Sequence, residues 1–298
     1  MCGIVGLFLK DKSLEPQLGS MLSQMLISLS DRGPDSAGIA IYGAPSRNEA
    51  KITIQSAKPE RDFRGLDAEL AKAIGAPVSI AVKSTHAVLR TAPDKVDAAR
   101  EALQSMRPDV RIMGAGEAVE IYKEVGLPEA VVDRFDVRSM TGTHGIGHTR
   151  MATESAVTTM GAHPFSTGAD QCLVHNGSLS NHNNVRRELV REGMKFETEN
   201  DTEVAAAYLS SQMAHGKNLG EALEGTLSDL DGFFTFVVGT KNGFGVVRDP
   251  IACKPAVMAE TDQYVAFGSE YRALTKLPGI DNARVWEPEP ATVYFWEH

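Results

Sequence analysis

Cys2-Gly3-Ile4-Val5-Gly6-Leu7-Phe8-Leu9 follows the initiator methionine directly, and this apolar run predicts a buried first strand. A small residue at position 2 favours removal of Met1, which leaves Cys2 with a free α-amine beside its thiol. Such an amine has a pKa of about 7.7–8.0, so it can accept the thiol proton and activate the sulfur as a nucleophile. Taken alone, the stretch fits a small cysteine buried in a strand better than it fits a nucleophile.

The composition is that of an ordinary globular chain, long enough for one large domain or two smaller ones. A net charge of −9 without a basic stripe argues against binding to nucleic acid or to an anionic membrane. No apolar run is long enough to cross a bilayer, and the N-terminus does not read as a signal peptide. Cys2, Cys172 and Cys253 are far apart, which argues against a disulfide framework or a cysteine-held metal. We therefore predict a reduced, cytoplasmic protein with no metal, redox centre or other cofactor of its own.

The pattern of apolar residues predicts an α+β fold. A helix is expected over 16–30, because Leu18, Met21, Leu22, Met25, Leu26 and Leu29 share one helical face. After a break at 32–36, a second strand is expected over 37–42. Residues 46–142 differ in character and predict a small α/β insertion, with strands at 78–82 and 110–113, a helix at 94–107 and one or two helices over 117–134.

The main domain is expected to resume at 143. Strands are predicted at 143–149, 171–176 and 232–239, helices at 182–193, 202–214 and 219–229, and a meander of short strands up to 296. Helices placed between strand-rich ends favour antiparallel sheets covered by helical layers.

Two segments contain arginines of chemical interest. Arg32-Gly33-Pro34-Asp35-Ser36 fits a helix stop and turn, and it fits equally well an arginine that supports a nearby site. Gly147-His148-Thr149-Arg150 follows an apolar strand, and an arginine at a strand end can hold a carboxylate with two parallel N–H···O bonds. Considered alone, Arg150 fits a surface salt bridge better.

Asn176 and Gly177 end a predicted strand. The pair is typical of a turn, but an asparagine amide beside a glycine N–H also supplies two neutral donors for an oxyanion. His175 suggests a Cys/His dyad, which we set aside because an N-terminal cysteine carries its own base. Asp201 precedes the helix at 202–214, where it can cap the helix or pair with a substrate ammonium.

Together these groups predict one ligand. Cys2 supplies a nucleophile, Asn176 and Gly177 an oxyanion site, Arg150 a carboxylate partner and Asp201 an ammonium partner. An α-amino acid with a reactive side-chain amide needs all of them, and that ligand is glutamine.

The five segments, in this order, resemble the class II glutamine amidotransferases, the group with an N-terminal nucleophile. The resemblance covers 2–45 and 143–298, so the amidotransferase domain is expected over 2–298 with the 46–142 insertion within it. It implies a four-layer αββα sandwich, Cys2 as nucleophile, and Asn176 with Gly177 as the oxyanion hole. It also implies substrate binding by Arg150, Asp201, Thr153 and Arg32. Met151 and Glu154 depart from residues that relatives often carry, an aromatic residue and a histidine respectively.

The layout is similar to the stand-alone amidotransferase subunits of glutamate-synthase-like systems, with the small subunit of N-methylglutamate synthase as the nearest specific match. The chain is expected to end where the amidotransferase domain ends. The resemblance implies a hetero-oligomer in which ammonia from glutamine passes to separate flavin and iron–sulfur synthase subunits. Two alternatives are a stand-alone N-terminal-nucleophile hydrolase of another amide and a non-catalytic subunit that kept the fold. A different acceptor for the ammonia is also open.

Overall fold

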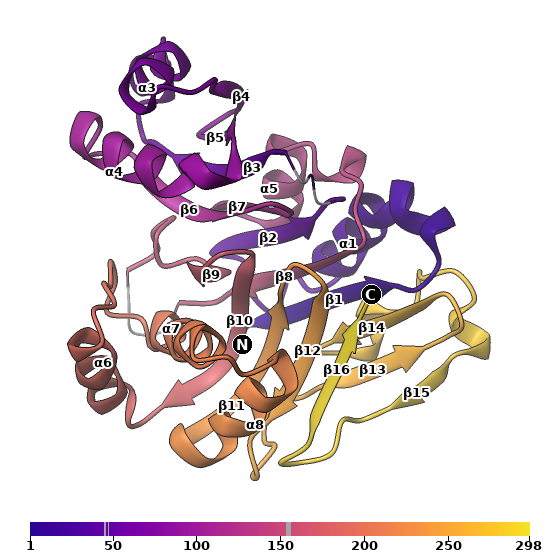
Figure 1. The fold of residues 1–298 in the computed structure, drawn as a ribbon. Helices are drawn as coiled ribbons and strands as arrows, with labels where there is room; N and C mark the ends of the chain where they lie inside the picture. Colours follow the sequence, from indigo (N-terminus) through magenta and orange to yellow (C-terminus); the bar gives the residue numbers. More distant parts are fainter. Residues whose placement is uncertain (45, 47, 153–155) are drawn as a thin grey trace.

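The apolar run at the N-terminus forms β1 (Gly3–Leu9), the central strand of a seven-stranded antiparallel sheet in the computed structural model (Figure 1). The structure describes residues 1–44, 46, 48–152 and 156–298. The sheet has the order β15-β13-β14-β1-β8-β2-β7. Its other strands are β2 (Ser36–Tyr42), β7 (Val119–Val125), β8 (His144–Arg150), β13 (Val257–Glu260), β14 (Tyr264–Gly268) and β15 (Arg284–Trp286).

A five-stranded antiparallel sheet lies against the first, in the order β16-β12-β11-β10-β9. Its strands are β9 (Phe165–Gly168), β10 (Gln171–Leu179), β11 (Gly232–Gly239), β12 (Gly243–Arg248) and β16 (Val293–Glu297). The outer face of this sheet is covered by α6 (His182–Arg191), α7 (Asp201–Ala214) and α8 (Leu219–Asp229).

Three apolar cores separate four layers. The first lies between the seven-stranded sheet and α1 (Leu18–Ile27) with α5 (Pro128–Arg134), and it contains every residue of the apolar face predicted for the first helix. The second joins the two sheets, and the third lies beneath α6–α8. The predicted α+β fold, a four-layer αββα sandwich, is confirmed.

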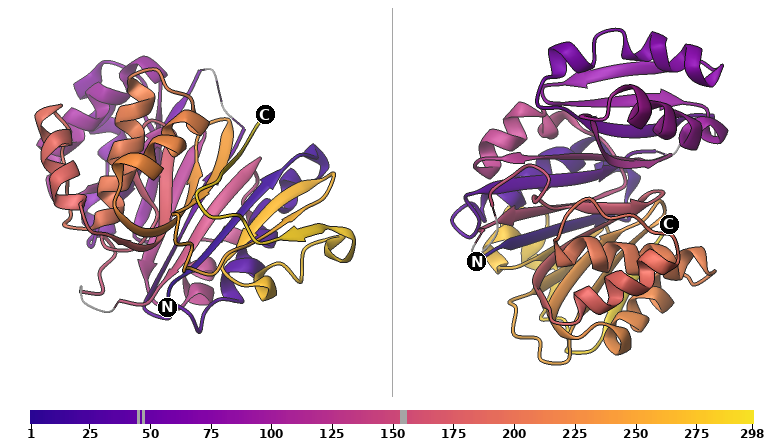
Figure 2. Two further views of the ribbon diagram at one scale, coloured as in Figure 1. Left: turned by 90° about the horizontal axis from the view of Figure 1, so that it is seen from below. Right: turned by 90° about the vertical axis from the view of Figure 1, so that its left-hand side faces the viewer.

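A separate layer lies beyond one edge of the sandwich, at the top of Figure 1 and of the right-hand view in Figure 2. This inserted layer (residues 50–116) has a four-stranded sheet in the order β4-β5-β3-β6 and its own apolar core. Its strands and helices are β3 (Ala50–Gln55), α2 (Pro59–Asp62), α3 (Leu66–Ile74), β4 (Ser79–Lys83), β5 (His86–Thr91), α4 (Val96–Met106) and β6 (Arg111–Gly116). The layer packs against β7 and β9, which are the edge strands of the two main sheets.

Asp170 ties the inserted layer to the sandwich. Its carboxylate accepts the backbone N–H groups of Glu117 (2.8 Å), Ala118 (2.8 Å) and Val119 (3.0 Å). A Cβ added to Gly116 would lie 2.1 Å from the same carboxylate, so only glycine permits this approach. Residues 117–119, where the chain leaves the inserted layer, are therefore fixed to Asp170 of the main domain.

The predicted helix over 117–134 is wrong in its first half. Val119–Val125 is the strand β7, which pairs with β2, and only Pro128–Arg134 is helical. The strand is buried on both faces, with Val119 and Ile121 in the core between the sheets and Tyr122 in the core beneath α1. Lys123 and Glu124 interrupt the apolar alternation that marks a strand, although both are buried.

The remaining helices are short 3-10 turns at Lys12–Gln17, Pro93–Lys95, Val137–Ser139, Tyr271–Ala273 and Ile280–Asn282. Among the residues that the structure describes, no helix is both long and apolar enough to span a membrane.

Candidate active site

A cleft of about 670 Å³ opens where the first residue of the chain meets the ends of β8 and β10. Six of the seven predicted site residues line it: Cys2, Arg32, Arg150, Asn176, Gly177 and Asp201. The seventh, Thr153, lies outside the described residues, as does Glu154. The fold thus brings together side chains that are up to 199 positions apart in the sequence.

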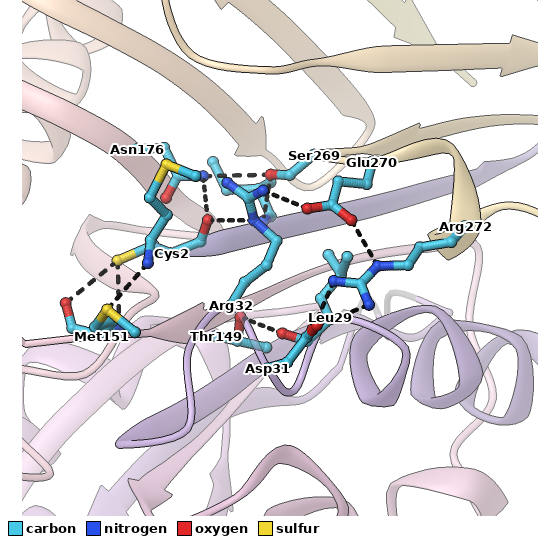
Figure 3. Close-up of polar contacts among 12 residues, drawn as sticks. Cys2, Leu29, Asp31, Arg32, Thr149, Met151, Asn176, Ser269, Glu270 and Arg272 are labelled. Atoms are coloured by element: carbon cyan, nitrogen blue, oxygen red, sulfur yellow. Dashed lines mark hydrogen bonds and ion pairs between the residues drawn. The ribbon is translucent and has the colours of Figure 1, made fainter.

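Cys2 is half-buried and immediately precedes β1. Its Sγ accepts the backbone N–H of Met151 at 3.4 Å and lies 3.7 Å from the Met151 carbonyl oxygen (Figure 3). Met1 is largely exposed, and its amino group lies 3.0 Å from the Met151 sulfur. Met151 therefore contacts both Cys2 and Met1 directly.

Arg32 holds the main chain of Cys2. Its Nε donates to the Cys2 carbonyl oxygen at 2.9 Å, and its guanidinium also donates to the carboxylate of Glu270. Glu270 is bound in turn by Arg272 at 2.6 Å, and the hydrogen bond from Arg32 lowers the pKa of that carboxyl. Arg272 continues the chain of charges to Asp31 (Figure 3).

The turn that contains Arg32 is shaped by two neighbours. A Cβ on Gly33 would lie 2.3 Å from the carbonyl carbon of Thr149, so the turn can pack on β8 only with glycine there. Asp35 accepts the Ala152 N–H at 2.8 Å and donates its own N–H to the Arg150 carbonyl at 3.1 Å. Sequence reasoning missed this role of Asp35 because the same residues form an ordinary turn.

Asn176 places its amide beside Cys2. Its Nδ2 donates to the Cys2 carbonyl oxygen at 3.2 Å and to Ser269 Oγ at 3.3 Å. Ser269 Oγ also accepts the Ile4 N–H at 2.8 Å, so it links β1 to the site. Ser269 was missed as well, because it directly follows β14 in a region that predicted only a meander.

Gly177 follows with φ +148°, a conformation that favours glycine. A Cβ at this position would lie 1.9 Å from the carbonyl oxygen of Phe233 on β11. Among the described residues, β9 pairs with β10 at Gln171 and Leu173 and not beyond. The edge of β10 at 176–177 is therefore open toward the cleft.

Arg150 and Asp201 supply opposite charges to the cleft. Arg150 is the last residue of β8, is 6% exposed, and donates from Nη1 to the Ala156 carbonyl at 3.3 Å. Asp201 is the first residue of α7, and its Oδ2 accepts the Leu179 N–H at 2.9 Å. Its side chain keeps 22% of its surface exposed, so one carboxylate face remains accessible.

The N-cap of α7 is not Asp201, the cap that the sequence suggested. Asn200 caps the helix through its side chain, which accepts the Thr202 N–H at 2.8 Å. This leaves the Thr202 hydroxyl free to contact His175 Nδ1 at 3.1 Å and His163 Nε2 at 3.3 Å.

Three histidines are buried at the cleft: His163 and His175 line it, and His148 lies behind them. Burial lowers the pKa of His148 to about 3 and lowers the pKa values of His163 and His175, so all three are neutral at physiological pH. His175 contacts Thr202 and, within the part of the chain that is described, makes no hydrogen bond to Cys2. In the same described ranges, no group of three or more His, Cys, Asp or Glu side chains could hold a metal ion.

A family model described as a glutamine amidotransferase domain matches residues 148–276. The chain is 75% identical to the glutamine amidotransferase-like protein GlxB of Rhizobium meliloti, over 100% of this chain and 99% of that protein. It is 36% identical to a putative glutamine amidotransferase of Methanothermobacter thermautotrophicus, with both chains fully covered.

Solved structures share the fold at low sequence identity. The glutamine phosphoribosylpyrophosphate amidotransferase of B. subtilis superposes with a TM-score of 0.63 at 19% identity. That match covers 99% of this chain but 47% of the other, so the chain spans about half the length of that enzyme.

Proposed function

Since the chain belongs to the class II glutamine amidotransferases, which have an N-terminal nucleophile, we propose that Cys2 carries out its hydrolysis of glutamine to glutamate and ammonia. One observation carries this assignment. A single cleft is lined by a thiol at position 2, an asparagine amide donor, an arginine and a partly exposed carboxylate. These are the groups that the side-chain amide, α-carboxylate and α-ammonium of glutamine require.

The proposed reaction begins after Met1 is removed. The freed α-amine of Cys2 takes the thiol proton, and the thiolate attacks the side-chain carbonyl carbon of glutamine. Asn176 Nδ2 and the Gly177 N–H stabilise the oxyanion of the tetrahedral intermediate. The C–N bond breaks, ammonia leaves with the proton from the amine, and water hydrolyses the thioester to release glutamate.

The contacts of Arg32 favour a role other than the substrate binding that the family resemblance implies. Because its guanidinium donates to the Cys2 carbonyl and to Glu270, we propose that it fixes the nucleophile and does not itself bind glutamine. The substrate clamp then consists of Arg150 for the α-carboxylate and Asp201 for the α-ammonium, with Thr153 as a further contact proposed from the motif alone.

Arg150→Lys and Asp201→Asn are expected to raise KM for glutamine about 10- to 100-fold, with a smaller effect on kcat. Each change removes a charge-assisted or bidentate contact to a group far from the reacting carbon. Glutamate formation measured against glutamine concentration gives both constants. Glutaramate, which lacks the α-amine, serves as the matched control: Asp201→Asn and the wild type should hydrolyse it equally. A KM for glutamine that stays unchanged in both variants would contradict the clamp.

The activity itself is tested by assaying glutamate release from the purified full chain and measuring its intact mass. Active enzyme is expected to lack Met1 and to take up one equivalent of a glutamine-like diazoketone. Faster hydrolysis of an unrelated amide would favour the stand-alone hydrolase, and absence of both labelling and hydrolysis would favour a non-catalytic subunit. Active enzyme that retains Met1 would refute the role of the Cys2 amine.

We further propose that the ammonia passes to a separate synthase of the glutamate-synthase or N-methylglutamate-synthase kind, whose flavin and iron–sulfur groups lie on other subunits. A second cavity, of about 760 Å³, supports this proposal. It shares Met160 and Thr198 with the glutamine cleft and extends beneath α4 and β6 of the inserted layer. The inserted layer then covers an exit for ammonia and offers a surface for the synthase. The reaction would take place in the reducing cytoplasm, where Cys2, Cys172 and Cys253 remain free thiols.

Purification of the tagged full chain from its native cell tests whether a synthase binds to it. The expected co-purifying subunits contain flavin and iron–sulfur clusters, and hydrogen exchange of the complex should show protection over 96–116. Protection confined to other surfaces would contradict docking on the inserted layer. If the chain is fully active and purifies alone, the proposal that it has a synthase partner is contradicted.

A further inference from the structure

His148 was part of the motif that drew attention to Arg150, but the proposed reaction gives it no role. It lies on β8 in the seven-stranded sheet, is 1% exposed, and reaches across to β10 in the other sheet. Its Nε2 lies 3.1 Å from the carbonyl oxygen of His175 and 3.2 Å from Oδ1 of Asn176. One ring nitrogen thus faces both the backbone and the side chain of the proposed oxyanion site.

The backbone carbonyl decides the tautomer of this ring. A carbonyl oxygen can only accept a hydrogen bond, so the Nε2 that faces it must carry the proton. The imidazole is neutral, which leaves Nδ1 without a proton, and Nδ1 has no hydrogen-bond partner among the described residues. His163 stacks on the ring, with centroids 4.1 Å apart and planes 22° apart, and so holds its orientation.

The tautomer in turn decides which way the Asn176 amide points. An N–H at His148 Nε2 requires an acceptor opposite it, so Oδ1 of Asn176 must face His148 and Nδ2 must face Cys2. The reversed amide would set N–H against N–H and would turn an acceptor toward the oxyanion. The Cys2 carbonyl oxygen supports the same orientation, because it can only accept and lies 3.2 Å from Nδ2.

We propose that His148 is a positioning residue, which fixes the Asn176 amide with its N–H₂ group aimed at the reacting carbonyl of glutamine. The inference rests on the proposed role of Asn176, and it assigns to the histidine of Gly147-His148-Thr149-Arg150 a function separate from that of Arg150. His148 does not touch the substrate and does not exchange a proton with it.

Substitution of His148 separates positioning from packing. His148→Phe keeps a buried ring but removes the donor, and we expect kcat for glutamine hydrolysis to fall about 10²-fold, as for loss of one oxyanion donor, with little change in KM. His148→Gln restores an N–H donor near the same place and should recover most of the rate. Loss in His148→Phe without recovery in His148→Gln would overturn the proposal.

His144→Phe is the matched control. His144 lies four residues earlier on the same strand, is equally buried, and also bonds through Nε2 to a carbonyl, that of Thr240 at 2.8 Å. It does not contact Asn176. The two phenylalanine variants should lower Tm by similar amounts, but His144→Phe should keep the wild-type kcat. An equal loss of kcat in both would show that packing alone is responsible.

A double-mutant cycle tests whether His148 acts through Asn176. In an Asn176→Ala background, His148→Phe is expected to have no further effect on kcat, because the amide to be oriented is gone. Fully additive losses would overturn the inference. Wild-type protein without glutaminase activity would instead refute the proposed function and leave the orientation of the amide to be measured separately.

Nitrogen-15 NMR of histidine-labelled wild-type protein gives that separate measurement. His148 should show a protonated Nε2 and a bare Nδ1 between pH 5 and pH 9. The Nδ1–H tautomer would overturn the proposal whatever the activity.

Discussion

Cys2→Ala is expected to abolish glutamine hydrolysis while leaving the fold intact. In the proposed reaction Cys2 forms the covalent intermediate, so its loss should lower kcat by ~10⁴-fold or more, as with other nucleophile deletions. The side chain contributes little to stability because its contacts, at 3.4 and 3.7 Å, are long ones to the backbone of Met151. Glutamate release and thermal unfolding of the same sample measure the two effects.

Cys253→Ala is the control for this substitution. Cys253 is exposed, and it should be neutral both for activity and for labelling by a glutamine-like diazoketone. Cys172 is unsuitable as a control, because it is buried and lies 3.1 Å from the Tyr42 hydroxyl. Residual activity of Cys2→Ala near the wild-type rate would refute the assignment of the nucleophile.

Gly177→Ala is expected to give the second large effect, a loss of both stability and activity. A methyl group there would lie 1.9 Å from the Phe233 carbonyl oxygen and 2.8 Å from Phe234 Cα, at a φ of +148°. The strand β10 must move away from β11, which displaces the neighbouring Asn176 amide. We expect destabilisation of about 3 kcal/mol or more, within the range of overpacking combined with backbone strain, and a fall in kcat of at least about 10²-fold.

Gly216→Ala separates the collision from the strain. Gly216 also has a positive φ, +93°, but nothing lies within 4 Å of an added Cβ. It should cost only the conformational strain, about 1–3 kcal/mol, and keep the wild-type kcat. Denaturant unfolding and glutaminase assays of both variants measure the losses of stability and of kcat. Equal losses of stability, with activity retained in Gly177→Ala, would show that position 177 has no special place in the site.

The layers of the fold were readable from the sequence because helices and half-buried strands have regular apolar periods. The face from Leu18 to Leu29 has the helical period and is buried as expected. β7 was misread because a strand buried on both faces loses that period, and Lys123 and Glu124 added charges that suggested a solvated helix. Lys123 is nevertheless buried, and its Nζ donates to the Ala162 and Pro164 carbonyls at 2.8 and 3.1 Å.

The lining of the cleft could be predicted for a different reason. Cys2, Arg150, Asn176 and Asp201 are chemically specific, and each lies in or directly beside a regular element. Asp35, His148 and Ser269 act through hydrogen bonds to groups that lie far away in the chain, such as Ser269 to the Ile4 N–H. The local sequence around these residues does not indicate their hydrogen-bond partners. The partners come within reach only when β1 pairs with β8 and β14.

The central position of β1 has a consequence for how this enzyme loses activity on heating. β1 pairs with β14 and β8 on its two sides and all seven of its residues are buried, so we expect it to belong to the last cooperative unit to open. Cys2, the proposed nucleophile, directly precedes this strand. We therefore expect thermal inactivation to follow global unfolding, even if the inserted layer, with its own core, melts first.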